Sequence, residues 1–581
     1  MTRRIVLDIE TNTKHDKIWL VVTKDIDTGE VNTWTEASNL REYLKDVSLI
    51  AGHNVVSFDA PVLNKCWQTK ITRKQCWDTL IVSRLLDPSR DGGHSLEAWG
   101  ERLGTQKIDY GAIWKWLNDY TDKDTHGREF DAPHMALLRH YCLRDVEVTL
   151  ELFHHLQGEL QKHGFSEYSV ELEHRVAAII AQQTRNGFKL DQPYATMLLA
   201  DIQGKVDAIS EQLQQRWPPY EVSRGIGKKG KELKPLLVTF NPGSRQQIGE
   251  KLKELGWKPK EFTPTGHPIV DEGVLAKLDI PEAKLIAEYL LLNKRISQIK
   301  SWFDEVKEDG RVHGRVITNG AVTGRATHSS PNMGQIPNTS SQYGAECRTC
   351  WTVEKGNVLV GCDLSGIELR CLSHYMQDQE WQRELLEGDV HWKNTQAFGL
   401  VPMGTTKQDI KEHKDARNLS KTLTYSVLYG AGPSKVGSTV GGGAKEGAKL
   451  IDNFMNNTPA LKRLKKKIDA YVPKGYVPGL DGRKIWIRSE HAALNSLLQS
   501  AGAIIAKQWL ICIDEDLKRA KVPFKQLAWV HDEVQLETSA EYGDIVGKIC
   551  VEAARKAGEV LNFRCPVDAE YRVGSNWYET H

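Results

Sequence analysis

The stretch RNLSKTLTYSVLYGAG, from Arg417 to Gly432, combines evenly spaced cations and aromatic rings with a glycine-rich end. Arg417, Lys421 and Tyr425 recur every four residues, and Tyr429 continues the row. On an α-helix these positions stack along one face, about one turn apart. A row of positive charge suits a polyanion, because arginine grips phosphate oxygens in a bidentate way and lysine adds a point charge. Tyr425 offers a flat face to a base or sugar, although a solvated helix with incidental aromatic rings would show the same pattern.

Two acidic segments far along the chain favour the first interpretation. GNVLVGCDLSGIELR predicts an apolar strand that ends at Asp363, with Glu368 shortly after it. LAWVHDEVQLE predicts a strand that breaks at His531, Asp532 and Glu533 and then resumes. A pair of acidic groups from distant strands suits two Mg²⁺ ions, and beside a cationic helix such ions would act on a triphosphate.

A second set of carboxylates lies within the first 145 residues. Asp8 and Glu10 are two apart on a predicted strand, so both side chains leave the same face. Asp59 follows in HNVVSFD, and YCLRDVEV places Tyr141 and Asp145 one helical turn apart. Hard cations take oxygen ligands, and two ions about 4 Å apart can stabilise the attacking and leaving oxygens of phosphoryl transfer.

Length and composition set the class of protein. A chain of 581 residues is too long for one core, so several domains are expected. The 77 basic and 76 acidic residues nearly cancel, so net charge does not identify a partner. The start, MTRRIVLDIETNT, lacks the apolar segment of a signal peptide, and no uninterrupted apolar stretch approaches the roughly 20 residues of a membrane span. The one C-x-x-C pair, Cys347 and Cys350, has no second pair at zinc-site spacing, which favours reduced cysteines in a cytoplasmic protein.

The order of elements predicts an α/β domain, a helical middle, and a second α/β region with a helical insertion. Predicted strands cover 3–11, 17–25 and 47–54, and predicted helices cover 76–86, 134–156, 171–215 and 286–306. The segment WPPYEVSRGIGKKGKELKP, residues 217–235, is rich in Gly, Pro and Lys and predicts a loop.

These segments together resemble family-A DNA polymerases, and most closely the replicative polymerases of short-tailed bacteriophages. The ordered motifs D-x-E, N-x₃-F-D and Y-x₃-D resemble the proofreading 3′→5′ exonucleases with four acidic ligands. TGRATHSSPNMGQIPN, GDVHWKN, GLDGRKIWIRS and HAALNSLLQSAGA also read as stretches of the polymerase family, so the resemblance covers nearly the whole chain.

The resemblance implies an α+β / α/β multidomain fold in which an RNase H-like exonuclease domain precedes a right-hand polymerase domain. The implied domains are the exonuclease at 1–165, the thumb and connecting helices at 166–315, the palm at 316–389 and 488–581, and the fingers at 390–487. No 5′-nuclease domain is expected, since the exonuclease motif begins at residue 8.

Residue roles also follow from the resemblance. Asp363, Asp532 and the carbonyl of Leu364 would hold the polymerase metals, with Glu533 beside them. Asp8, Glu10, Asp59 and Asp145 would hold the exonuclease metals, and Tyr141 would orient the attacking water. Arg417, Lys421 and His391 would hold the incoming triphosphate, Tyr425 would stack on the nucleotide, Tyr429 would guard the template position, and Glu368 would reject ribonucleotides.

The implied contacts to DNA come from Arg325, Asn332, Gln335, Asn495, Gln499 and His531. In the minor groove the acceptors differ little between base pairs, so such contacts would check pairing geometry rather than sequence. Each of these polar residues could instead have a structural role, and either member of the Asn and Gln pair could cap or cross-link helices.

The implied cofactor is Mg²⁺, two ions per active site, with Mn²⁺ as a substitute. The implied partners are primer–template DNA, dNTPs, a replicative helicase-primase and a single-stranded DNA-binding protein, in the cytoplasm of a bacterial host and without a membrane. Some phage relatives carry a long thumb insertion that recruits thioredoxin. Here the connection from Trp217 to Leu236 is about twenty residues, so thioredoxin is not an expected partner. Its cations at 223–234, and the cluster LKRLKKKIDAYVPKG, are either phosphate contacts or solvated faces.

Three other functions compete with a DNA polymerase. A nuclease with a DNA-holding module would not need the second acidic pair. A single-subunit RNA polymerase shares the basic helix and the H-D turn, but the exonuclease motifs and Glu368 favour a DNA product. A replisome scaffold leaves both predicted metal sites unexplained.

Overall fold

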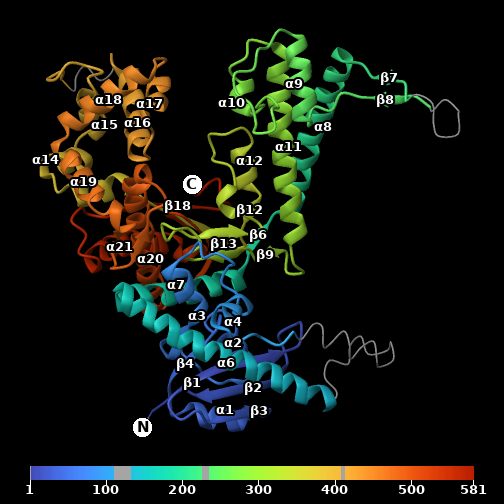
Figure 1. The fold of residues 1–581 in the computed structure, drawn as a ribbon, viewed down its shortest axis with the longest axis vertical. Helices are drawn as coiled ribbons and strands as arrows, with labels where there is room; N and C mark the ends of the chain where they lie inside the picture. Colours follow the sequence, from blue (N-terminus) through green and yellow to red (C-terminus); the bar gives the residue numbers. More distant parts are fainter. Residues whose placement is uncertain (1, 110–131, 225–233, 407–411) are drawn as a thin grey trace. The chain divides into compact units, whose positions relative to one another are not determined.

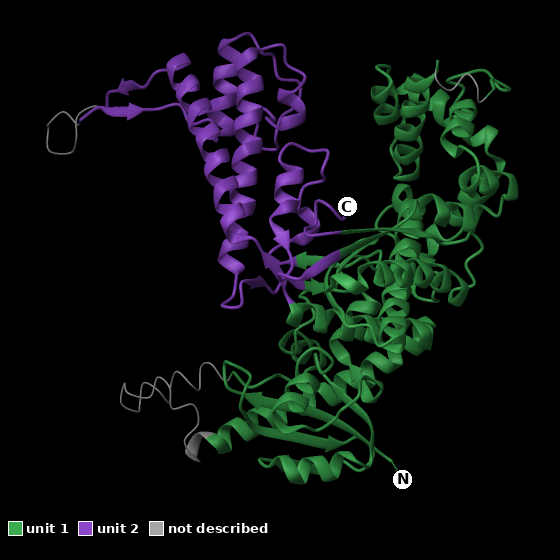
Figure 2. Ribbon diagram, turned by 180° about the vertical axis from the view of Figure 1, so that it is seen from behind, with its two compact units in different colours: residues 1–186, 316–328, 360–573 green, residues 187–315, 329–359, 574–581 purple. Residues whose placement is uncertain are grey.

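The computed structural model describes residues 2–109, 132–224, 234–406 and 412–581 (Figure 1). The chain forms two compact units, and both are discontinuous in sequence (Figure 2). The first unit contains 1–186, 316–328 and 360–573, and the second contains 187–315, 329–359 and 574–581.

The amino-terminal part of the first unit is built on a five-stranded sheet. Its order is β3-β2-β1-β4-β5, with β1 antiparallel to β2 and parallel to β4. The strands are β1 (Arg3–Thr11), β2 (Ile18–Asp25), β3 (Val31–Trp34), β4 (Val47–Gly52) and β5 (Cys76–Asp78). The three strands predicted from short apolar runs are therefore confirmed, although β4 ends two residues before the predicted end at 54.

Helices cover both faces of this sheet. Leu7 and Ile9 pack in one core with residues of α1 (Ala37–Leu44) and α2 (Asp59–Trp67). Val6 packs in another core with Leu138 and Cys142 of α6 (Ala132–His163). Because side chains alternate along a strand, Asp8 and Glu10 lie on the α6 face of β1.

The predicted helix at 76–86 is wrong in its first three residues. Cys76–Asp78 is strand β5, and α3 covers only Thr79–Leu86. The Asp78 side chain accepts hydrogen bonds from the backbone N–H groups of Leu80 and Ile81, so it caps α3 and ends the strand. A further helix, α4 (Leu96–Leu103), follows.

The predicted helical stretch at 171–215 is interrupted. It consists of α7 (Glu167–Asn186), β6 (Phe188–Leu190) and α8 (Gln192–Arg216). Gly187 separates α7 from β6 with φ +63°, a left-handed conformation that favours glycine and ends helices.

The second unit is a set of helices beside a small sheet. Strand β6 lies between β12 (Trp351–Thr352) and β9 (Arg311–Val312), and α8 packs on α11 (Pro281–Glu305). The other helices are α9 (Arg245–Glu254), α10 (Glu272–Leu275) and α12 (Gly344–Thr349).

The loop prediction at 217–235 is wrong in part. Residues Tyr220–Val222 form strand β7, which pairs with β8 (Leu236–Val238) as an antiparallel hairpin. Residues 225–233, which carry most of the predicted basic segment, lie outside the described residues.

The carboxyl-terminal core of the first unit is a four-stranded sheet with buried helices. Its order is β16 (Lys525–Val530), β17 (Glu533–Ser539), β13 (Asn357–Leu364) and β18 (Ala569–Gly574). Helices α13 (Ile367–Met376), α20 (Ala493–Arg519) and α21 (Gly543–Val560) share its core. Among the described helices, Glu490–Arg519 alone has the length and hydropathy to cross a membrane. Since 94% of its most apolar window is buried, it acts here as a core helix.

A helical insertion connects β13 to α20. It contains α14 (Gln379–Leu386), α15 (Val390–Phe398), α16 (Lys414–Leu428), α17 (Pro433–Thr439), α18 (Ala444–Asn457) and α19 (Pro459–Asp469). The hairpin β14 (Tyr476–Pro478) and β15 (Lys484–Trp486) follows. The row of Arg417, Lys421 and Tyr425 lies on α16 as predicted, and Gly430 breaks the helix with φ +79°.

A buried group of charges links α7 to α20. Glu173 of α7 accepts a hydrogen bond from Lys507 Nζ at 2.5 Å and pairs with Arg483 Nη2 at 2.7 Å. Arg483 also pairs with Asp481 at 2.7 Å. All four residues are buried. The two acidic and two basic side chains balance each other's charge. Buried charges need such pairing, because removing an unpaired charge from water costs much free energy.

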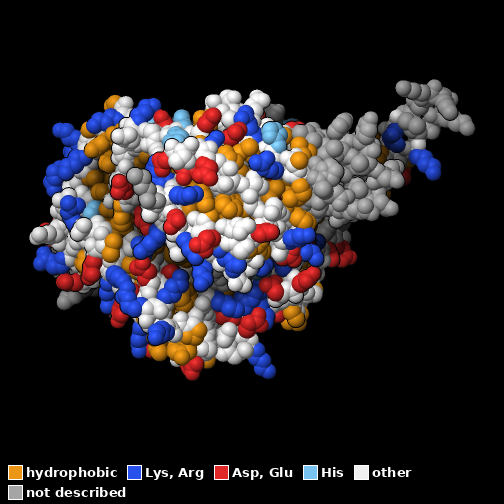
Figure 3. Space-filling view, turned by 90° about the horizontal axis from the view of Figure 1, so that it is seen from below, with side chains coloured by type: hydrophobic (Ala, Val, Ile, Leu, Met, Phe, Trp, Pro, Cys, Tyr) orange, Lys and Arg blue, Asp and Glu red, His pale blue; other side chains and the backbone are white. Residues whose placement is uncertain are grey.

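The surface shows no field of one sign on the face drawn in Figure 3. Lysine and arginine side chains are mixed with aspartate and glutamate over the coloured part of that face. This distribution agrees with the net charge of +1.

Candidate active sites

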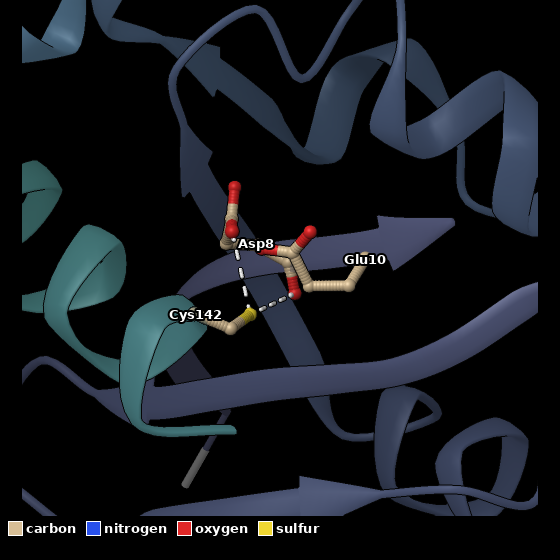
Figure 4. A group of neighbouring side chains, drawn as sticks. All are labelled: Asp8, Glu10 and Cys142. Carbon is tan, nitrogen blue, oxygen red and sulfur yellow. Dashed lines mark hydrogen bonds between the residues drawn. The ribbon is translucent and has the colours of Figure 1, made fainter. Parts of the chain in front are cut away.

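The first candidate site lies where β1 faces α6. Figure 4 shows Asp8 and Glu10 on β1 and Cys142 on α6. One ligand atom from each of the three lies within 4.8 Å of the others. The Cys142 thiol donates to Asp8 Oδ2 at 3.3 Å. Since a thiol is a weak donor, Asp8 keeps most of its capacity to bind a cation.

Asp59 and Asp145 complete the carboxylates of this site, named here the β1 cluster (Asp8, Glu10, Asp59 and Asp145). Asp59 begins α2, and Asp145 lies on α6; both are buried. Burial, then the charge of Asp145, raises the pKa of Asp8 to about 7. Burial, then the charge of Asp8, raises the pKa of Glu10 to about 9 and also raises that of Asp59. Burial also raises the pKa of Asp145, so the four carboxylates carry more negative charge than the positive charge beside them balances.

Asp78 is a residue of this region that sequence reasoning missed. Its carboxylate accepts hydrogen bonds from the backbone N–H groups of Asn54 and Val56, both at 3.0 Å. Asn54 has φ +74°, and the turn it makes leads into α2 and Asp59. Asp78 therefore holds the backbone of the turn that leads to Asp59. In the sequence, the only sign of this role is that Asp78 stands directly before an apolar helix.

Lys107 is the second missed residue. Its Nζ lies 2.7 Å from Asp145 Oδ2 and donates to the Tyr141 hydroxyl at 3.1 Å. Burial, then Asp145, raises the pKa of Tyr141 to about 12, so the phenol keeps its proton. Tyr141 and Asp145 thus meet as their spacing predicted, with a cation between them.

The second candidate site lies at the ends of β13 and β17. Leu364 N donates to Asp532 O at 3.0 Å, which joins the end of β13 to the turn between β16 and β17. Asp363 is exposed, while the flanking Cys362 and Leu364 are buried. Burial raises the pKa of Asp532. The two predicted acidic groups are thus brought together by strands that are 169 positions apart in numbering.

The turn that carries Asp532 has a strained backbone. Val530 pairs with Glu533, so His531 and Asp532 form a two-residue hairpin loop. His531 has φ +58°, which a residue with a side chain rarely adopts and which recurs at functional sites. Glu533 is buried on β17 and accepts a hydrogen bond from Gln535 Nε2 at 2.7 Å.

Glu368 connects three segments of this site. It lies in the first turn of α13, and its Oε2 accepts a hydrogen bond from the Tyr429 hydroxyl at 2.7 Å. Arg325 Nη2 lies 3.4 Å from Glu368 Oε1. The carboxylate therefore ties the end of α16 to α13 and to the segment that carries Arg325.

The cationic row on α16 faces α15. Arg417 Nε donates to Asp389 Oδ2 at 2.7 Å, and Asp389 also accepts from Trp392 N at 3.0 Å as the cap of α15. Burial, then Arg417 and Lys421, lowers the pKa of His391. The Tyr425 ring lies 6.5 Å from that of His391 and 6.1 Å from that of Tyr429. Sequence reasoning missed Asp389, although it stands in the quoted segment GDVHWKN.

The predicted DNA contacts divide between the two units. Asn495 and Gln499 lie four residues apart on α20, and Arg325 and His531 belong to the same unit. Asn332 and Gln335 belong to the other unit, where both are exposed. Asn332 Oδ1 accepts a hydrogen bond from Gly334 N at 3.1 Å. Asn332 therefore caps the 3₁₀ helix Met333–Gln335, which is a structural role.

Comparison with known proteins identifies the families of the two parts of the chain. Residues 5–161 match the model of a 3′-5′ exonuclease, and residues 220–579 match that of DNA polymerase family A. The chain is 33% identical to the DNA-directed DNA polymerases of Enterobacteria phage T3 and Escherichia phage T7, over 99% of the chain and all of each relative. DNA polymerase I of Pseudomonas aeruginosa is 25% identical over 93% of the chain and 58% of its own length.

A solved structure shares the fold. The POL domain of Pol1 from M. smegmatis, in complex with DNA primer-template and dNTP, superposes with a TM-score of 0.78 at 18% identity, over 100% of this chain and 96% of that one. The expected fold class, a 3′-5′ exonuclease domain followed by a polymerase domain, is confirmed. The chain belongs to DNA polymerase family A.

Proposed function

We propose that the chain extends DNA primers by two-metal nucleotidyl transfer at Asp363 and Asp532, and removes mismatched 3′ ends at the β1 cluster. The observation that carries the first half is the hydrogen bond from Leu364 N to Asp532 O, because it brings both carboxylates to one edge of the sheet. The four clustered carboxylates around β1 support the second half.

The residues present fit divalent metal ions, which polymerase and exonuclease domains of this kind generally use. The Asp145 Oδ1 atom is buried without a hydrogen-bond partner among the described residues, so a metal ion bound there would supply the partner that this oxygen needs. The oxygen donors of Asp8, Glu10 and Asp59 suit Mg²⁺, with Mn²⁺ as a substitute. At the other site Asp363, Asp532 and the Leu364 carbonyl supply oxygen, beside Glu533. Bound ions would activate the attacking oxygen and neutralise charge on the leaving oxygen.

The nucleotide would bind along α16. Arg417, Lys421 and His391 would hold the triphosphate, because cationic donors stabilise its charge. Tyr425 would stack on the nucleotide, and Tyr429 would stand at the template position. Glu368, fixed by Tyr429 and Arg325, would occupy the space that a ribose 2′-OH needs.

Primer–template DNA would lie against Arg325, Asn332, Gln335, Asn495, Gln499 and His531. At the β1 cluster, Tyr141 would orient the water that attacks the 3′-terminal phosphodiester. The proposed domains are the exonuclease at 1–165, the thumb and connecting helices at 166–315, the palm at 316–389 and 488–581, and the fingers at 390–487. The proposed partners are a helicase-primase and a single-stranded DNA-binding protein. The proposed location is the cytoplasm of a bacterial host.

Two variants test the assignment of the two sites. Asp532→Asn should abolish primer extension and leave digestion of single-stranded DNA intact. Asp8→Ala combined with Glu10→Ala should remove 3′→5′ digestion while extension persists and mismatches accumulate. Robust extension by the first variant, or native digestion by the second, would show that the carboxylates are structural. Extension with ribonucleotides instead of deoxynucleotides would favour an RNA polymerase.

A further inference from the structure

Arg483 lies between β14 and β15, and it contacts the turn that carries Arg325. Its Nη1 atom donates a hydrogen bond to Asn319 Oδ1 at 3.4 Å. A Cβ atom added at Gly324 would lie 2.8 Å from the same Nη1 atom, so the backbone of Gly324 lies against the guanidinium. All of these residues belong to the first unit. The guanidinium therefore touches both ends of the segment 319–324, which directly precedes Arg325.

The Arg483 side chain is held from its other side by two carboxylates. Its Nε and Nη2 atoms donate to the Asp481 carboxylate at 2.9 and 2.7 Å, and Nη2 also lies 2.7 Å from Glu173 Oε1. The Arg483 side chain is 3% exposed. Because the donors of a guanidinium lie in one plane, these bonds also fix the direction in which Nη1 points.

The segment from Asn319 to Arg325 is a turn closed by its own backbone. Gly324 N donates to Ala321 O at 2.8 Å, and Ala321 N donates to Arg325 O at 3.1 Å. Gly324 has φ +76°, a left-handed conformation that favours glycine. Since these bonds fix the shape of the turn, a contact at Asn319 and Gly324 also determines where Arg325 begins.

Arg325 leaves this turn toward the polymerase site. Its Nη2 atom lies 3.4 Å from Glu368 Oε1, and its side chain is 27% exposed. A guanidinium has five N–H donors, so Glu368 does not use them all. Hydrogen bonds weaken steeply when distance or angle departs from the optimum, so an arginine that contacts a base edge needs its backbone in one place.

We infer that Arg483 and Asn319 are positioning residues for primer–template binding, which hold the turn at 319–325 so that Arg325 reaches the DNA. This role rests on the proposed function, which places Arg325 on primer–template DNA. Both positioning residues are buried, so they act through Arg325 rather than on the DNA itself. Their loss should raise the KM for primer–template more than it lowers kcat.

The test measures primer–template binding to the full chain by fluorescence anisotropy in a chelator, so that neither bound metal nor turnover contributes. Asn319→Ala removes the acceptor of Arg483 Nη1 and should raise the Kd for primer–template about 2- to 10-fold, as for the loss of one hydrogen bond. Asn319→Asp keeps an acceptor oxygen and should recover most of the loss. It gives up no other bond, because Asn319 Nδ2 has no partner among the described residues.

A matched control comes from the same hairpin. Trp486 Nε1 donates to Leu86 O at 2.6 Å, so Trp486→Phe removes a hydrogen bond that leads to the amino-terminal part of the unit and not to the turn at 319–325. Its Kd for primer–template should stay native. Arg483→Lys keeps the charge balance of the buried group and removes Nη1, so it serves as a second variant should Asn319→Ala fold poorly. Thermal unfolding checks the folding of each variant.

A double-mutant cycle with Arg325→Ala separates positioning from general stability. If Asn319 acts through Arg325, Asn319→Ala should raise the Kd less in the Arg325→Ala background than in the native chain. A purely structural asparagine would lower the unfolding temperature and give additive effects on Kd.

Several outcomes would overturn the inference. A native Kd in both Asn319→Ala and Arg483→Lys would do so, as would equal losses in Asn319→Ala and Trp486→Phe, or fully additive effects with Arg325→Ala. If Arg325→Ala itself leaves the Kd unchanged, the proposed DNA contact of Arg325 fails together with the inference. If Arg325→Ala weakens binding and Asn319→Ala does not, the inference fails alone.

Discussion

Tyr425 lies on α16 between His391 and Tyr429, and it is half-buried. Its hydroxyl can donate a hydrogen bond near the sugar and phosphates of a bound nucleotide, where phenylalanine offers nothing. A nucleotide without a 3′-OH would then lose less transition-state stabilisation. We therefore expect the native protein to accept dideoxynucleotides almost as well as deoxynucleotides.

Tyr425→Phe should discriminate strongly against dideoxynucleotides. A hydrogen bond to a charged group contributes about 1.5–3 kcal/mol, which corresponds to roughly tenfold or more in rate ratio. Competitive incorporation on one primer–template measures the ratio, with Tyr471→Phe as the same chemical change outside α16. Equal discrimination by the native protein and Tyr425→Phe would remove the role proposed for the hydroxyl.

The positions of single site residues could be predicted where their spacing in the sequence matches the period of one strand or helix. Asp8, Glu10, Tyr141 and Asp145 follow strand and helix periods, and the structure brings them together. Lys107 stands in no regular element, and its partner Tyr141 is 34 residues away, so no period connects them. The same limit applies to Asp78, whose role depends on where β4 and β5 lie side by side.

At the scale of elements, Asp389 joins two helices of the insertion. It caps α15 and pairs with Arg417 of α16. Asp389→Ala should lower the free energy of local opening at the start of α15 by about 0.5–2 kcal/mol, because an N-cap is lost. Asp389→Asn keeps a capping oxygen and should cost less. Hydrogen exchange of the Trp392 amide measures both, and equal losses would show that the ion pair, not the cap, stabilises this helix start.

The carboxylates buried between β1 and α6 predict that the stability of the metal-free protein depends on pH. Folding raises the pKa of Asp8 to about 7 and that of Glu10 to about 9, chiefly by burial, from ordinary values near 4. The folded state therefore binds more protons than the unfolded state between these values, and its stability falls as pH rises from about 4 to 9.

Thermal unfolding in a chelator across this pH range measures the effect. Asp8→Asn combined with Glu10→Gln should flatten the profile, because the groups that resist ionisation are gone. Added Mg²⁺ should restore stability at high pH, since a ligand that binds only the folded state stabilises it. A native profile that does not change with pH would contradict the argument.

Long elements were predictable and three-residue strands were not. Strand β1 and helix α16 each show several periods of their pattern, and both lie where the sequence predicts them. Strands β5, β6 and β7 have three residues each, too few to show an alternation. Their positions depend on pairing with distant strands, and so on tertiary structure.

At the scale of the whole molecule, the chain is shorter than its phage relatives. The alignments with the T3 and T7 proteins extend over 720 and 721 positions, against 581 residues here, so those relatives have segments that this chain lacks. The connection from Trp217 to Leu236 holds the β7–β8 hairpin. We expect that thioredoxin does not raise the processivity of this protein.

Processivity on a long primed template, with and without thioredoxin, tests this expectation. Stimulation by thioredoxin would contradict it. A salt series on the same template tests whether the lysines of the basic segment at 223–234 contact duplex phosphates, since such contacts weaken steeply with salt. Replacing those lysines without effect on processivity or salt slope would show a solvated segment.

The buried charges of Glu173, Asp481, Arg483 and Lys507 determine where the protein can be divided. A polymerase fragment that begins after Asn186 would lose Glu173 and leave two buried cations facing one carboxylate, and breaking such a pair costs about 3–5 kcal/mol. A fragment that begins at Gly164 keeps α7 and uncovers His174 and Ala177, which face the amino-terminal domain and carry no buried ion pair. We expect 164–581 to express as a folded fragment and 187–581 to aggregate. In modular terms, α7 belongs to the polymerase, and the exonuclease domain can be removed only by a cut on the amino-terminal side of that helix.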